Sequence, residues 1–203
     1  SGEKVAIIGA SGSGKTTISQ LIAGVYAKNS GDILYNDISI DNISKKSLRE
    51  HLFLVLQMPI LFNNTLRFNL TMGENISNEK IKEALKIAQL NSMLENLPDG
   101  LDTIVGKMGI RLSGGQRQRL SIARMILANP RVVIFDESTS ALDVQTETKL
   151  FENLENILKD KTVITIAHRL STVKNASKIF VLEDGELVQS GTHMELKDEI
   201  GHY

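Results

Sequence analysis

A glycine-rich segment near the start of the chain has the residue types and spacing of a phosphate-binding loop. The segment GASGSGKT, Gly9 to Thr16, fits G-x-x-x-x-G-K-[ST] and has an extra glycine at Gly12. Several backbone N–H groups must converge on one phosphate, and glycine permits the backbone angles that this needs. Lys15 would supply a cation for the β- and γ-phosphates, and the Thr16 hydroxyl would ligate Mg²⁺. The residues expected to bind nucleotide here are Gly9, Ala10, Ser11, Gly12, Ser13, Gly14, Lys15, Thr16 and Thr17.

Two acids close an apolar segment later in the chain. VVIFDE, Val132 to Glu137, reads as a buried strand that ends in Asp136 and Glu137. The carboxyl ends of strands in a parallel sheet face the ligand crevice, so we expect Asp136 to emerge beside the phosphate loop and hold the Mg²⁺ shell. Glu137 would lie on the γ-phosphate side and orient or deprotonate water.

Two more polar residues follow apolar segments in the same way. Gln57 comes after Leu52 to Leu56 and can offer its amide to metal or water, although a surface glutamine at a subdomain boundary would look the same. His168 follows TVITIA, where a neutral imidazole can donate an N–H to the γ-phosphate, or serve as a structural hydrogen-bonding residue. The candidate catalytic residues are Glu137, His168, Lys15 and Gln57, and the candidate metal residues are Thr16, Gln57 and Asp136.

A second candidate anion site lies in RLSGGQRQRL, Arg111 to Leu120. Two glycines after a serine, followed by good helix formers, predict a helix start whose backbone amides point outward. The residues expected to bind phosphate here are Ser113, Gly114, Gly115 and Gln116.

The elements that must position these residues form an α/β pattern. Strands are predicted at Val5 to Ile8, Val132 to Phe135, Thr162 to Ile166, Lys178 to Leu182 and Glu186 to Gln189, with a hairpin turn at Asp184-Gly185. A helix is predicted from Lys15 to Ala23. The segment between Pro59 and Ala128 has helical periodicity instead, and Asn78 is a candidate helix cap. We expect an α/β core from residues 1–57 and 129–203, with an inserted all-helical subdomain at 58–128.

Composition excludes several classes of function. The 203 residues carry a formal net charge of -1, so no basic field recruits nucleic acid. Because there is no cysteine, disulfides, thiolate zinc sites and thiol nucleophiles are excluded. No apolar stretch has the length of a bilayer span, and the opening SGEKVAIIG does not have the pattern of a secretory signal.

The motifs stand in an order that resembles the nucleotide-binding domain of ABC transporters. GASGSGKT, Gln57, LSGGQ at Leu112 to Gln116, VVIFDE, SALD at Ser140 to Asp143, and AHRLSTV around His168 cover nearly the whole chain. The resemblance implies a RecA-like P-loop NTPase core and the Walker A, Q-loop, signature, Walker B, D-loop and H-loop roles in that order. It adds Asp143 to the expected nucleotide contacts.

The resemblance also implies why one domain has two anion sites. In the family, two such domains pack head to tail, and each LSGGQ covers the ATP held by the other's phosphate loop. It implies ATP and Mg²⁺ as cofactors, and a second ABC ATPase domain and a transmembrane domain as partners. The expected location is the cytoplasmic face of a membrane, and Thr103 to Gly109 is similar to the segment that exporters place against coupling helices.

Three functions remain open at this point. The leading one is the ATPase domain of an exporter. The second is a soluble ABC ATPase that acts on DNA or ribosomes. The third is an inactive nucleotide-binding fragment, because the family's N-terminal β-subdomain carries an adenine-stacking aromatic residue, and this chain begins eight residues before Gly9. We expect weakened ATP binding on that account.

Overall fold

A computed structural model describes residues 2–136, 142–167, 173, 175–198 and 201. The chain divides into two compact units, which we call the sheet unit and the helical unit. The sheet unit comprises Ser1–Leu54, Pro130–Glu137 and Asp160–Tyr203, and the helical unit comprises Val55–Asn129 and Ser138–Lys159. The described part of 138–159 therefore groups with the helical unit, whereas the sequence analysis assigned those residues to the core.

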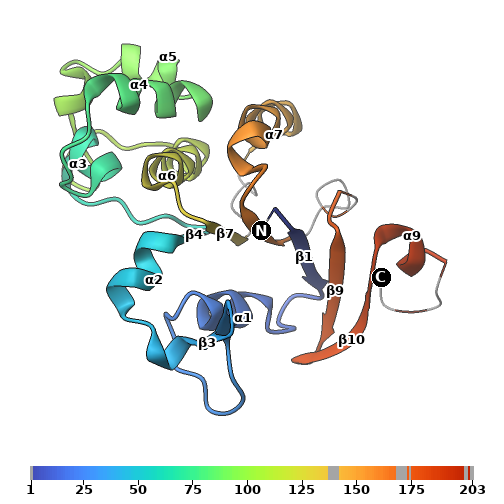
Figure 1. Cartoon of the computed structure of the whole chain (residues 1–203). Helices are drawn as coiled ribbons and strands as arrows, with labels where there is room; N and C mark the ends of the chain where they lie inside the picture. Colours follow the sequence, from blue (N-terminus) through green and yellow to red (C-terminus); the bar gives the residue numbers. More distant parts are fainter. Residues whose placement is uncertain (1, 137–141, 168–172, 174, 199–200, 202–203) are drawn as a thin grey trace. The chain divides into compact units, whose positions relative to one another are not determined.

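The sheet unit is built on one six-stranded sheet with the order β10-β9-β1-β8-β7-β4 (Figure 1). Strand β1 pairs in parallel with both β8 and β9, and β7 pairs in parallel with β8. Strand β10 pairs with β9 in the antiparallel direction. The predicted mostly parallel α/β core is confirmed. The strands are β1 (Lys4–Gly9), β4 (Leu52–Val55), β7 (Val132–Asp136), β8 (Thr162–Ile166), β9 (Lys178–Glu183) and β10 (Glu186–Gly191).

Strand β1 packs against apolar side chains on both faces, which explains the unbroken apolar segment from Val5 to Ile8. Successive residues of a strand point to opposite faces, and Ala6 and Ile7 of β1 belong to two different apolar clusters. Ala6 packs in the cluster that Leu196 of α9 (His193–Leu196) covers, and Ile7 packs in the cluster that Ile18 of α1 (Lys15–Ile22) covers. The predicted hairpin is also confirmed, because Asp184 and Gly185 between β9 and β10 both have positive φ angles.

Short elements complete the sheet unit. Strands β2 and β3 form a short hairpin that turns at Asn36 and Asp37, both of which have positive φ angles. The sequence analysis did not predict this hairpin. These elements are α1 (Lys15–Ile22), β2 (Leu34–Tyr35), β3 (Ile38–Ser39), the 3-10 turn η1 (Ile40–Asn42), α2 (Lys45–His51) and α9 (His193–Leu196).

The helical unit has its own apolar core, in which α6 contacts both α3 and α4 (Figure 1). Ile81, Ala84 and Leu85 of α4 are fully buried against Leu120 of α6, as the spacing of three and four predicted. The elements are β5 (Asn64–Thr65), α3 (Leu66–Thr71), α4 (Asn78–Ile87), α5 (Asn91–Glu95), the 3-10 turn η2 (Gly100–Asp102), β6 (Ile104–Val105), α6 (Gly114–Ala128) and α7 (Val144–Leu158).

Two details of the helical unit differ from the sequence prediction. The unit is not all-helical, because β5 and β6 form a short antiparallel pair through Asn64–Val105 and Thr65–Ile104. The cap of α4 is Ser77, whose hydroxyl accepts the Lys80 N–H, and Asn78 is the first helical residue.

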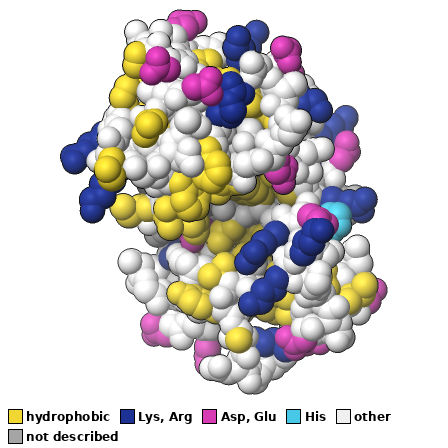
Figure 2. Space-filling view, turned by 90° about the vertical axis from the view of Figure 1, so that its left-hand side faces the viewer, with side chains coloured by type: hydrophobic (Ala, Val, Ile, Leu, Met, Phe, Trp, Pro, Cys, Tyr) yellow, Lys and Arg dark blue, Asp and Glu magenta, His cyan; other side chains and the backbone are white. Residues whose placement is uncertain are grey.

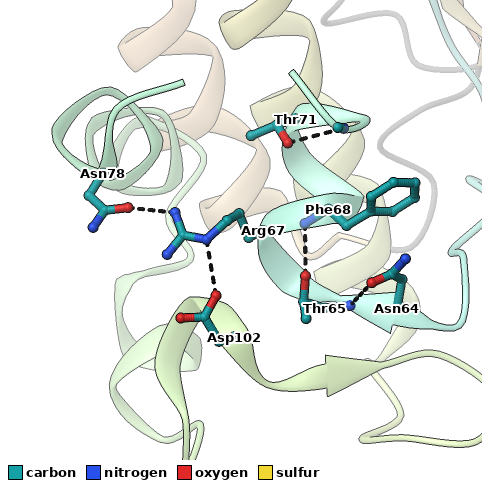
Figure 3. Close-up of polar contacts among 8 residues, drawn as sticks. Asn64, Thr65, Arg67, Phe68, Thr71, Asn78 and Asp102 are labelled. Carbon is teal, nitrogen blue, oxygen red and sulfur yellow. Dashed lines mark hydrogen bonds and ion pairs between the residues drawn. The ribbon is translucent and has the colours of Figure 1, made fainter. Parts of the chain in front are cut away.

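A polar network fixes the start of α3 within this unit (Figure 3). The Thr65 hydroxyl caps the helix by accepting the Phe68 N–H at 3.0 Å. One residue into the helix, Arg67 donates to the Asp102 carboxylate at 3.0 Å and to the Asn78 amide oxygen at 2.5 Å. Arg67 thereby joins α3 to η2 and to the first turn of α4.

In the part of the chain that the structure describes, no helix is long and apolar enough to span a bilayer.

Candidate functional site

The phosphate loop lies between β1 and α1, where the sequence placed it. A Cβ atom on Gly9 would stand 2.2 Å from the Leu182 carbonyl oxygen of β9, so only glycine fits at the end of β1. The loop then turns through a hydrogen bond from the Ser13 N–H to the Ala10 carbonyl at 3.2 Å. The Gly185 N–H of the β9–β10 turn donates to the Ser13 carbonyl at 3.2 Å and braces the loop from the neighbouring hairpin.

Helix α1 starts differently from most of the other described helices. Its first flanking residue, Gly14, has a φ of 95° and offers no side chain to cap the helix. By contrast, a serine, threonine or aspartate oxygen accepts a backbone N–H at the start of six other helices, namely α2, α3, α4, α6, α7 and α9. The first N–H groups of an α-helix have no partner inside the helix. The first turn of α1 therefore presents backbone N–H groups that can donate hydrogen bonds to an anion, at the positive end of the helix dipole.

Lys15 places its charge at this loop. Its side chain is 5% exposed, and its ammonium donates to the carbonyl oxygens of Gly9 at 2.9 Å and Ala10 at 2.7 Å. The Ser13 hydroxyl lies 3.5 Å from the same nitrogen. An ammonium has three protons on a flexible stem, so it can exchange these neutral acceptors for phosphate oxygens without leaving the loop.

Thr16 and Asp136 lie together although they are far apart in the chain. The Thr16 hydroxyl donates to one carboxylate oxygen of Asp136 at 3.2 Å. Asp136 ends β7, and β8 alone separates β7 from β1, so the two strands deliver the acid and the loop to the same edge of the sheet. Asp136 is 3% exposed, and Thr16 is exposed.

These two residues fit a magnesium ion on a nucleotide. Mg²⁺ prefers oxygen ligands, and at nucleotide sites it takes one or two protein oxygens together with phosphate oxygens and water. A hydroxyl and a buried carboxylate at 3.2 Å supply such oxygens. Within the described residues, no three His, Cys, Asp or Glu side chains gather where they could hold a metal ion.

The other expected residues are Glu137, His168, Ser140 and Gln57. Glu137 and His168 lie outside the described residues, and so does Ser140 of the SALD segment. Gln57 follows β4 in the helical unit with an exposed side chain, and its carbonyl accepts the amide N–H of Gln118 at 3.1 Å. The structure thus unites Lys15, Thr16 and Asp136 in one unit, and the roles of the other residues stay predictions.

The signature segment forms the predicted helix start. Ser113 is the N-cap of α6, and its hydroxyl accepts the Gln116 N–H at 3.2 Å while the Gln116 side chain accepts the Ser113 N–H at 2.8 Å. This capping uses an acceptor lone pair of the serine and leaves its hydroxyl proton for another acceptor. Ser113 is exposed, and Gly114 and Gly115 form the first turn.

Asp143 caps α7 in the helical unit. Its carboxylate accepts the Thr146 N–H at 2.9 Å and the Thr146 hydroxyl at 2.7 Å. These hydrogen bonds hold the pKa of the Asp143 carboxyl below its ordinary value. Arg119 of α6 donates to the Gln89 carbonyl at 2.7 Å, and Gln89 donates to the Thr146 carbonyl at 3.4 Å. The signature helix and the first turn of α7 are therefore linked through Gln89.

Sequence reasoning missed a buried polar network on α6. Arg124, 9% exposed, donates to the carbonyl oxygens of Asn69 and of Ile60, the latter at 2.9 Å. Its third bond, at 3.0 Å, goes to the side-chain oxygen of Asn69, which is itself fully buried. Burial lowers the pKa of the Arg124 guanidinium, which nonetheless stays charged because arginine starts so high. A charged residue inside the apolar run IARMIL was the available signal.

Two segments of the helical unit, residues 58–62 and 104–110, expose large apolar side chains. The Met108 N–H donates to the Asn63 side chain at 2.8 Å, next to the β5–β6 pair. Figure 2 shows hydrophobic side chains gathered on this unit. We call the exposed residues of these segments the apolar surface: Met58, Ile60, Phe62, Ile104, Met108 and Ile110.

Comparison with known proteins agrees with the motif order. The ABC transporter family model matches residues 1–140. An ATP-dependent lipid A-core flippase of Chromobacterium violaceum is 46% identical over all 203 residues, and one of Legionella pneumophila strain Paris is 47% identical. A solved bacterial Atm1-family ABC exporter with ATP bound has a TM-score of 0.89 at 40% identity, over 96% of this chain and 34% of that one. The chain spans 35% and 34% of the two flippases, about a third of their length. It belongs to the ABC transporter family.

Proposed function

We propose that this chain binds and hydrolyses ATP as the nucleotide-binding domain of an exporter. The observation that carries the proposal is the cluster of Lys15, Thr16 and Asp136 beside the uncapped start of α1. Lys15 and the α1 amides neutralise phosphate charge, and the helix dipole adds about 0.3 to 2 kcal/mol. Thr16 and Asp136 would hold a Mg²⁺ ion, whose charge would help to neutralise the phosphates of the nucleotide.

Glu137 follows Asp136 directly and is the proposed base. A carboxylate there takes a proton from the attacking water, and His168 and Gln57 orient the γ-phosphate and that water from the other motifs. Thr16 and Asp136 would supply oxygen ligands to Mg²⁺. Asp143 would contribute to the nucleotide contacts across the dimer.

Hydrolysis is proposed to need a second ABC ATPase domain. Ser113 is exposed, and its capping bond leaves the hydroxyl proton available. This hydroxyl and the Gly115 amide would contact the γ-phosphate of the nucleotide on the partner's loop. ATP then holds the two domains together, and loss of the γ-phosphate releases them.

The apolar surface supports a transmembrane domain as the other partner, with this domain at the cytoplasmic face of the membrane. Side chains such as Met108, 85% exposed, and Met58, 79% exposed, lie on segments that Arg124 and Asn63 fix internally. A contiguous exposed apolar patch marks an interaction site. The relatives named as flippases and exporter favour transport over action on DNA or ribosomes.

The direct test is nucleotide-dependent stabilisation of the chain together with phosphate release. We expect ATP to raise the unfolding temperature, Mg²⁺ to raise it further, and phosphate to be released at high chain concentration. Lys86→Met, an exposed lysine on α4, is a matched control for Lys15→Met. A chain that ATP does not stabilise would contradict the proposal.

A further inference from the structure

Ser19 is a fully buried serine in the middle of α1, and its hydroxyl lies against Asp136. The Ser19 oxygen is 3.3 Å from the second carboxylate oxygen of Asp136 and 2.8 Å from the carbonyl oxygen of Thr16. The pattern G-x-x-x-x-G-K-[ST] ends at Thr16 and assigns nothing to Ser19.

Two hydroxyls of α1 therefore meet the two oxygens of one carboxylate. Thr16 and Ser19 are three residues apart and lie on the same side of the helix. Thr16 donates to one oxygen of Asp136, and Ser19 is within hydrogen-bond distance of the other. A carboxylate held at one oxygen can still rotate about its terminal bond, whereas contact at both oxygens fixes its plane.

The chemistry of the position favours serine for a reason other than helix stability. Alanine is the better helix former and has no polar group to satisfy in a buried position. A bond to the Thr16 carbonyl would by itself satisfy the Ser19 hydroxyl locally, as in many helices that contain serine. That local bond does not require a carboxylate beside it, and Asp136 is only 3% exposed.

We propose that Ser19 is a positioning residue that orients the Asp136 carboxylate for Mg²⁺. The hydroxyl has one proton and two acceptors within reach, and donation to Asp136 leaves the Thr16-facing oxygen of the carboxylate directed at the metal position. This inference rests on the proposed function, because it assumes that nucleotide and Mg²⁺ bind at Thr16 and Asp136.

The test measures Mg²⁺ binding rather than turnover. The unfolding temperature of the chain is followed during a Mg²⁺ titration at a fixed, saturating concentration of AMP-PNP, a nucleotide that is not hydrolysed. We expect Ser19→Ala to need about tenfold more Mg²⁺ at the midpoint, the lower end of the effect of removing a residue that orients a metal-binding group. Its stabilisation by AMP-PNP in EDTA should equal that of the wild-type chain.

Two further comparisons separate positioning from a purely structural role. Ser47→Ala removes a hydroxyl from another helix of the sheet unit, α2, and should leave the Mg²⁺ midpoint unchanged. In an Asp136→Asn background, Ser19→Ala should shift the midpoint less than twofold, because the group that it orients has lost its charge.

The outcomes distinguish the two proposals. An unchanged Mg²⁺ midpoint in Ser19→Ala, or an equal shift with and without Asp136, overturns the role of Ser19 and leaves the proposed function standing. Weaker metal-free AMP-PNP binding in Ser19→Ala also overturns it, because the residue would then support the loop. A wild-type chain that AMP-PNP does not stabilise contradicts the proposed function itself, and the inference with it.

Discussion

The Thr16 hydroxyl lies 3.2 Å from the Asp136 carboxylate, although 120 positions separate the two residues in the chain. The order of the parallel strands accounts for this proximity, because β1 and β7 flank β8 and end at the same edge of the sheet. The loop that follows β1 and the acid that ends β7 consequently share one site.

Replacing Lys15 by methionine removes the ammonium and keeps most of the side-chain volume. Hydrogen bonds from a charged donor contribute about 1.5 to 3 kcal/mol, so we expect ATP to bind about 10- to 100-fold more weakly. Equilibrium titration with a fluorescent ATP analogue measures the effect. Lys86→Met should bind like the wild-type chain, and an equal loss in both variants would remove the special role of Lys15.

Glu137→Gln tests the proposed base. The amide cannot accept a proton from water, so turnover should fall about 10²- to 10⁴-fold. Nucleotide affinity should be retained, and the variant should form an ATP-dependent dimer that is visible in light scattering. Turnover at the wild-type rate would show that another group takes the proton.

Ser113→Arg tests the signature as a contact for a second copy. A large cation at this exposed position should abolish hydrolysis while ATP binding to the isolated chain stays unchanged. Ser113 also caps α6, and loss of a cap costs about 1 kcal/mol. Ser77→Ala, which removes the equivalent cap of α4, is therefore the matched control and should hydrolyse ATP normally. Parallel loss of binding and hydrolysis in Ser113→Arg would argue against a shared site.

Arg124→Met tests the buried network of the helical unit. The substitution leaves the carbonyl oxygens of Ile60 and Asn69 without their guanidinium donor, which should cost about 2 to 4 kcal/mol of unfolding free energy. Urea denaturation measures this loss, and Asn69→Ala should not add its full cost in the double variant. Arg49→Met, an exposed arginine of α2, should change stability by less than about 0.5 kcal/mol.

Asp143 gives a pH-dependent prediction. Hydrogen bonds from the Thr146 N–H and hydroxyl hold the pKa of its carboxyl below the ordinary value of 3.8 in the folded chain. The ionised Asp143 carboxylate therefore stabilises the folded chain fully above pH 3.8. This contribution is lost as the pH falls through the lower pKa of Asp143 in the folded chain. We expect the stability difference between the wild-type chain and Asp143→Asn to shrink over that window. A difference that is constant with pH would show that the charge of Asp143 does not stabilise the cap.

The sequence predicted the parts of this fold whose signals are local. GASGSGKT, VVIFD and the Asp184-Gly185 turn each combine residue types with a direct physical consequence, and the structure has them where they were expected. The helix start at Ser113 was predicted for the same reason. These residues determine backbone geometry within a few positions of themselves.

The missed features depend on contacts between distant residues. The bonds of Arg124 to Asn69 and Ile60 span 55 and 64 positions, and no local pattern marks their acceptors. The Ser19–Asp136 contact has the same origin. The two-residue strands β2, β3, β5 and β6 are too short to show a period, and the cap of α4 was wrong by one residue because Ser77 and Asn78 are both good caps.

Subunit complementation tests the central claim, that two copies build each hydrolytic site. Lys15→Met carries an intact signature, and Ser113→Arg carries an intact phosphate loop, so a mixed pair has one complete site and each variant alone has none. The measurement is phosphate release by an equimolar mixture of the two variants. We expect the mixture to turn over ATP at a rate well above the sum of the rates of the separate variants. A mixture that is as inactive as its components, under conditions where the wild-type chain turns over, would contradict it.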